Sequence, residues 1–161
     1  MLFRSLNPFL IFAFTPLILA LWKRQAARGR EPSTVAKMAY GCFGNAAAHL
    51  ILFAAALQAG PDKASWLWVA AYVVVITVGE LYLSPTGLSL VTKVAPLRCL
   101  SMMMGVWLAT SFTGGFLAGW LGSLWSDMDK SRFFLMIALI AAAAGLVVLG
   151  FVRPLRPILR D

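Results

Sequence analysis

Acidic side chains and histidine are scarce in this sequence. Its 161 residues contain six Asp and Glu and one His; 12% of them are charged and 61% are hydrophobic. No Ser-His-Asp order, HExxH or Gly-rich phosphate loop occurs in the chain. We therefore expect neither an enzyme nor an ordinary soluble domain.

Cysteine is also rare. Cys42 and Cys99 lie in or beside apolar segments and lack the paired spacing of a disulfide framework or a zinc site. We interpret both as small buried thiols and expect neither a metal nor a cofactor. The formal charge of +8 does not indicate nucleic acid, because the basic residues cluster beside apolar runs, where they meet lipid phosphates or set topology.

Long apolar runs are abundant. They cover residues 6–22, 38–59, 65–91, 99–125 and 133–152. Backbone groups cannot stay unpaired in hydrocarbon, and these runs are too long for barrel strands, so the spans must be helices. We predict an all-α fold, a polytopic transmembrane helix bundle of about five spans that forms one transmembrane domain over residues 1–161. Pro85 is the expected kink site of the third span.

The basic residues indicate how the chain lies in the lipid bilayer. The first run is followed rather than preceded by a basic cluster, unlike a signal peptide, so we interpret it as an uncleaved span. With five spans, ten of the 14 Lys and Arg residues fall on the side of the C-terminus and four on the other. The positive-inside rule then predicts a protein of the cell inner membrane with a cytoplasmic C-terminus.

Glu80 is the acidic residue that lies well inside an apolar run. A carboxylate is costly in the membrane, so Glu80 is a functional-site hypothesis. No Lys or Arg lies deep in the five runs, so a cation for it would come from a ligand, another chain or a further part of the same protein. Thr77 and Ser84 share the helical face of Glu80. The alternative to a functional site is a polar stripe that forms hydrogen bonds with neighbouring helices.

Three other polar or small-residue patterns have structural interpretations. Asn45 and His49 share a helical face, for which we favour interhelical hydrogen bonds over a proton relay. Gly115 and Gly119 form a small-x-x-x-small pair, which predicts close helix packing. Trp107 lies on a face of small and polar residues in the fourth run, and we expect that face to look inward.

Three segments resemble the proton-dependent oligopeptide transporter family of the major facilitator superfamily. Gly79 to Pro96, which begins Gly-Glu-Leu-Tyr-Leu-Ser-Pro-Thr-Gly, resembles its tenth helix. Phe3 to Pro8 resembles the start of its eighth helix, and Met103 to Trp107 its eleventh. The five spans therefore look like helices eight to twelve, the C-terminal part of a twelve-helix transporter. Arg4 departs from the glutamine that is usual in the family.

The resemblance implies symport of di- and tripeptides, with protons as the coupling ion. It implies that Glu80 holds the peptide amino terminus, that Asn7 hydrogen-bonds peptide, that Ser84 lies near the site and that Trp107 helps to form an aromatic side-chain pocket. The N-terminal transporter helices would be a necessary partner, so we expect this chain alone not to transport.

Two other interpretations stay open. The chain could be a small membrane scaffold or assembly subunit without transport activity, which would use its glycine-rich faces to bind other helices. A membrane-embedded enzyme would rest on Glu80, His49 and Ser84 alone, and helix periodicity does not bring His49 to the other two.

Overall fold

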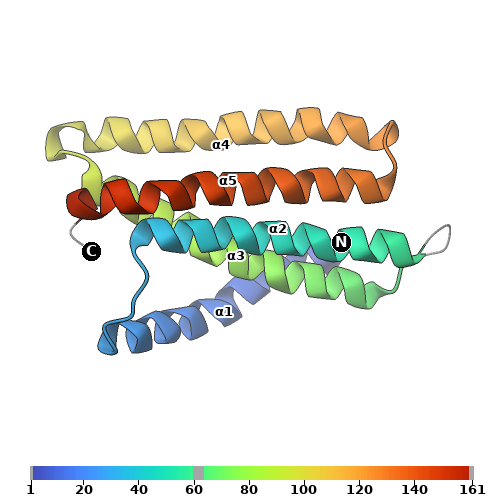
Figure 1. Cartoon of the computed structure of the whole chain (residues 1–161), viewed down its shortest axis with the longest axis horizontal. Helices are drawn as coiled ribbons and strands as arrows, with labels where there is room; N and C mark the ends of the chain where they lie inside the picture. Colours follow the sequence, from blue (N-terminus) through green and yellow to red (C-terminus); the bar gives the residue numbers. More distant parts are fainter. Residues whose placement is uncertain (1, 60–63, 160–161) are drawn as a thin grey trace.

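The computed structural model of the chain describes residues 2–59 and 64–159; within these ranges it leaves out the side chains of residues 2–7, 97 and 155–159. The long helices are α1 (Leu2–Ala27), α2 (Thr34–Ala59), α3 (Trp66–Val94), α4 (Leu100–Ser123) and α5 (Lys130–Leu159). Two short turns, η1 (Leu97–Cys99) and η2 (Leu124–Ser126), flank α4 (Figure 1). Each long helix contains a stretch long and apolar enough to cross a membrane. The predicted all-α transmembrane fold is confirmed.

The helices extend beyond the apolar runs that predict them. α1 continues to Ala27 instead of residue 22, and α2 begins at Thr34 instead of residue 38. Helical hydrogen bonding does not require apolar side chains, and Lys, Arg and Gln are good helix formers, so a helix continues into the headgroup region. α3 passes through Pro85 as one helix.

α2 lies at the centre of the bundle and packs against both α3 and α5. Glycines allow the two close approaches. A Cβ atom on Gly41 would lie 2.9 Å from the carbonyl oxygen of Gly79 in α3, and one on Gly145 in α5 would lie 3.1 Å from the Cε1 atom of Phe43. Both distances are too short for a larger side chain without movement, so these glycines set the spacing of α2, α3 and α5.

A polar and aromatic cluster joins α1, α2 and α3 at one end of the bundle. Lys37 of α2 forms an ion pair with Glu31, and its Nζ atom lies 4.3 Å from the centre of the Trp22 ring of α1. Trp22 in turn packs edge-to-face on Tyr82 of α3, with ring centres 5.5 Å apart. In the same region Lys93 Nζ donates to the Thr34 hydroxyl over 3.2 Å.

α4 stands apart from the rest of the bundle (Figure 1). Among the described residues it packs against α3, but no Cα atom of α4 lies within 8 Å of one in α5. A Cβ atom on Gly115 or Gly119 would meet nothing described within 4 Å. The expectation that this pair carries close packing is therefore wrong for this chain, because no described helix covers that face.

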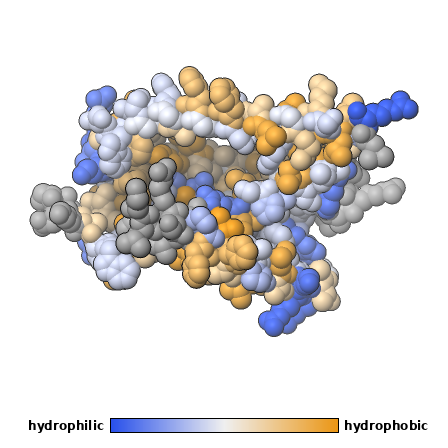
Figure 2. Space-filling view, turned by 180° about the vertical axis from the view of Figure 1, so that it is seen from behind, coloured by the Kyte–Doolittle hydropathy of each residue, from blue (hydrophilic) through white to orange (hydrophobic). Residues whose placement is uncertain are grey.

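The outer surface is that of a protein in lipid. Figure 2 shows apolar side chains spread over the face in view, with hydrophilic ones gathered mainly toward the two ends and a smaller group near the middle. Of the two cysteines, Cys42 is half-buried on α2, but Cys99 is exposed in η1. The expectation of a buried thiol is wrong for Cys99, because the short connection between α3 and α4 leaves it uncovered.

Candidate substrate-facing surface

The polar stripe of α3 runs from the interior of the bundle to its surface. Thr77 is fully buried, at 0% exposure, and its hydroxyl donates to the carbonyl of Val73 over 2.7 Å. Glu80 is half-buried and Ser84 is exposed. Thr77 therefore belongs to the packed core, whereas Glu80 and Ser84, one turn apart, form the accessible part of the stripe.

The close approach of α2 and α3 sets the position of Glu80. Its neighbour Gly79 faces α2, where a Cβ atom would lie 3.1 Å from the Asn45 amide nitrogen and equally near the Gly41 carbonyl oxygen. Successive helical residues are rotated by about 100°, so the Glu80 side chain leaves α3 beside this contact and not within it. A backbone contact without intervening side chains fixes the helix rotation, and with it the direction of the carboxylate.

Trp107 of α4 lies directly on Gly87 of α3. A Cβ atom on Gly87 would come within 2.1 Å of Cη2 and 2.6 Å of Cζ2 of the indole ring. Gly87 is buried and Trp107 is half-buried by this contact. Gly87 lies about one turn beyond Ser84, so the aromatic ring, the hydroxyl and the carboxylate follow one another along α3.

The remaining predicted positions have mixed outcomes. Asn7 lies in α1, but its side chain lies outside the described part of the chain. Thr110, Ser111 and Gly114, on the face of Trp107, are exposed. The Thr110 hydroxyl donates to the Trp107 carbonyl over 2.6 Å. The expectation that this face looks inward holds at Trp107, which packs on α3, but is wrong for Thr110, Ser111 and Gly114, which stay exposed.

His49 has a structural role in the bundle. Its Nδ1 atom lies 2.9 Å from the carbonyl oxygen of Asn45, one turn earlier in α2. Its ring packs edge-to-face on Tyr72 of α3, with ring centres 5.6 Å apart. This hydrogen bond is therefore within α2 and not between helices as expected. The contact between α2 and α3 is made by the two rings.

Sequence reasoning missed two residues that organise this surface. Gly87 belongs to the family-like segment Gly79 to Pro96, but its contact with Trp107 depends on how two helices pack. Lys37 is one of the basic residues that indicate topology, but its side chain is 10% exposed and is held between Glu31 and Trp22. The sequence offers no helical spacing rule for this pair, because Glu31 precedes α2 and lies six residues before Lys37.

These observations define an integral membrane protein. The chain has five apolar helices, α2 packs between α3 and α5 at the centre, and a carboxylate lies half-buried on α3. Such a carboxylate is typical of proteins that bind or move a solute within the membrane.

The family follows from comparison with known proteins. Residues 1–146 match the POT family, and the chain belongs to it. It is 29% identical over 160 residues to a di-/tripeptide transporter of Lactococcus lactis subsp. cremoris, covering 99% of this chain and 32% of that protein. It is 32% identical over 167 residues to a peptide transporter of Yersinia enterocolitica, again covering 99% of this chain and 32% of the relative.

Solved structures agree with this assignment. A POT family transporter in complex with a thioalcohol-conjugated peptide is 30% identical and superposes with a TM-score of 0.84, covering 92% of this chain and 30% of that one. The fold also matches a peptide transporter in complex with sulfate, with a TM-score of 0.89 at 23% identity over 98% of this chain and 32% of that one. The chain thus spans about a third of the length of the proteins it matches.

Proposed function

We propose that this chain is the C-terminal portion of a proton-coupled di- and tripeptide symporter, with its C-terminus in the cytoplasm. Its helices correspond to helices eight to twelve of the transporter. The observation that carries the proposal is Glu80, a half-buried carboxylate on α3, the helix that contains the family-like segment. The relatives that are named as di- and tripeptide transporters support the substrate class.

In this proposal Glu80 accepts hydrogen bonds from the ammonium group of a bound peptide. A hydrogen bond to a charged group contributes about 1.5–3 kcal/mol, so loss of the charge weakens binding about tenfold or more. Ser84 and the Trp107 ring lie farther along the same side of α3, where they would contact the peptide beyond its amino terminus. Asn7 would add a hydrogen bond from α1.

The chain alone is proposed not to transport. Alternating access needs two bundles that rock around a midplane site, and the chain spans about a third of its relatives. The exposed face of α4, where Gly115 and Gly119 meet no described neighbour, supports the idea that the helices of the missing part pack there. Supplying those helices should restore both the second bundle and this contact.

The test is proton-driven dipeptide uptake into membrane vesicles. One preparation contains this chain alone, and the other contains it together with the first seven helices of the Lactococcus lactis relative. We expect uptake only in the second preparation, and we expect Glu80→Gln to abolish it. Asp127→Asn is the matched control, because Asp127 is an exposed acid outside the spans, and it should leave uptake unchanged.

Each other outcome has a clear meaning. Uptake by the chain alone refutes its dependence on further helices and implies that copies of it build the second bundle. Uptake that survives Glu80→Gln refutes the role of the carboxylate. If neither preparation transports although both are inserted, a remnant or a scaffold without transport activity is the better account.

A further inference from the structure

Two hollows on the surface meet at the end of α5. The first has a volume of about 620 Å³, and its described lining comes from α5: Leu146, Leu149, Gly150, Val152 and Arg153. The second, of about 390 Å³, also contains Val152 and Arg153, and it continues onto the start of α2 and the connection before it. Because Val152 and Arg153 line both hollows, the two adjoin at these residues, and we call them together the groove, with an α5 limb and an α2 limb.

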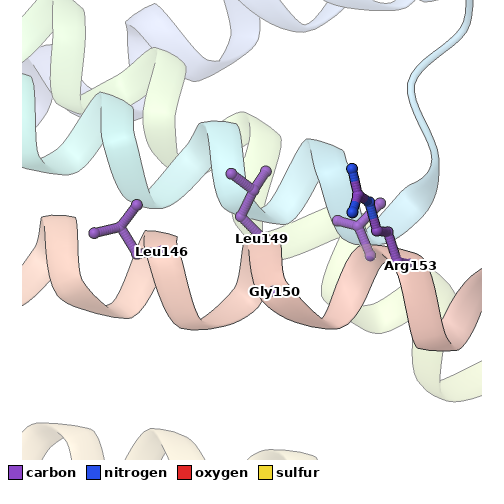
Figure 3. Close-up of a pocket in the computed structure, with 5 residues that line it drawn as sticks. Leu146, Leu149, Gly150 and Arg153 are labelled. Carbon is purple, nitrogen blue, oxygen red and sulfur yellow. The ribbon is translucent and has the colours of Figure 1, made fainter.

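The α5 limb is apolar and open. Leu146 and Leu149 are 62% and 42% exposed, and their side chains project from the same side of α5 as Arg153 (Figure 3). Gly150 keeps the limb hollow, since a Cβ atom there would meet nothing described within 4 Å. This limb lies within the apolar part of α5, at the depth of lipid acyl chains.

The α2 limb is basic. Arg30 and Arg153 both line it, and neither forms an ion pair with a described residue. Glu31 also lines it, but its carboxylate is paired with Lys37, so the arginine charges dominate. Tyr40, which is 51% exposed, stands at the rim. Tyrosine and arginine side chains at a helix end are typical of the headgroup level.

We propose that this groove binds one anionic phospholipid, with its phosphate between Arg30 and Arg153 and an acyl chain along Leu146, Leu149 and Gly150. A phospholipid joins an apolar chain to a phosphate in one molecule, as the groove joins its apolar limb to its basic limb at Val152 and Arg153. Basic pockets between transmembrane helices are known to hold anionic headgroups. The site does not depend on the proposed transport function.

The test measures lipid retained by the purified full chain. The detergent-solubilised protein is mixed with equal amounts of phosphatidylglycerol and phosphatidylcholine, and native mass spectrometry counts the bound lipids. We expect preferential retention of phosphatidylglycerol. Arg153→Gln and Arg30→Gln should each weaken that binding about fivefold. Arg132→Gln is the matched control, because this exposed arginine lies at the other end of α5, and it should have no effect.

A second variant tests the apolar limb. Gly150→Leu fills the hollow without touching a described neighbour, so it should reduce retention of both lipids, with the helical circular dichroism unchanged. Equal retention of the two lipids, or an equal effect of Arg132→Gln and Arg153→Gln, overturns the proposal. Displacement of the lipid by millimolar inorganic phosphate also overturns it, since a free anion would then be the ligand.

Discussion

Gly87→Ala tests the contact that holds α4 to α3. The added methyl carbon would lie 2.1 Å from Cη2 and 2.6 Å from Cζ2 of Trp107, whereas carbon atoms in contact prefer about 3.5–4.0 Å. The ring must therefore move by more than about 1 Å. Overpacking of this kind costs about 1–3 kcal/mol, although alanine gains up to about 1 kcal/mol over glycine as a helix former.

The two effects are separated by a double-mutant cycle with Trp107→Ala. In the wild-type background we expect Gly87→Ala to lower the free energy of unfolding by up to about 2 kcal/mol. When the ring is absent, the same change should be neutral or stabilising by up to about 1 kcal/mol, because only the helix-former term remains. The measurement is unfolding of the purified chain in mixed micelles, followed by far-UV circular dichroism.

A control in α4 sharpens the test. Gly105 also lies in a helix, but a Cβ atom there would meet nothing described within 4 Å. Gly105→Ala should therefore be neutral or slightly stabilising in both backgrounds. Our reasoning is refuted if Gly87→Ala has the same effect with and without the Trp107 ring, since the two residues would then not be in contact.

Three further predictions concern other contacts. Gly79→Ala should destabilise the chain by about 1–3 kcal/mol, because the methyl group meets the backbone of α2 at 3.1 Å; Gly119→Ala, with no described neighbour, should be neutral, and equal effects in micelle unfolding would contradict this. Lys37→Met should cost about 0.5–1 kcal/mol, because the ion pair and the cation–π contact with Trp22 are lost while the Glu31 side chain, 41% exposed, stays solvated; unchanged stability at neutral pH would contradict the importance of the pair. A side-chain hydrogen bond from Ser131 lowers the pKa of Asp129 in the folded chain. The ionised Asp129 therefore stabilises the folded chain fully at pH values above the ordinary aspartate pKa. This stabilisation is lost as the pH falls through the lowered pKa of Asp129 in the folded chain. Ser131→Ala should raise the Asp129 pKa in an NMR titration, and an unchanged value would refute the hydrogen bond.

The helices were predictable because their cause is local. A run of about 20 apolar residues must cross the membrane as a helix, and all five runs do lie in long helices. Glu80 could be singled out for a related reason, since a charge inside an apolar run is visible in the sequence. What it binds is still a prediction.

Contacts between helices were not predictable, because periodicity gives a face and not its neighbour. Gly115 and Gly119 show that a small-x-x-x-small pair permits close packing without ensuring it. Gly41 of α2 and Gly79 of α3 pack closely, although no pattern in the sequence relates these two glycines. The packing of Trp107 on Gly87 depends on how α3 and α4 cross. The predicted spans end before α1 does and begin after α2 does, because polar residues can continue a helix beyond the hydrocarbon.

The central position of α2 has a consequence for synthesis of the protein. α2 packs against α3, which follows it directly, and against α5, the last helix of the chain. At about 5–20 residues per second, the ribosome needs roughly 5–20 seconds to extend the chain from Phe43 to its contact at Gly145. During that interval one side of α2 must be covered by lipid or by the insertion machinery, so the bundle closes only when its final span has entered the membrane.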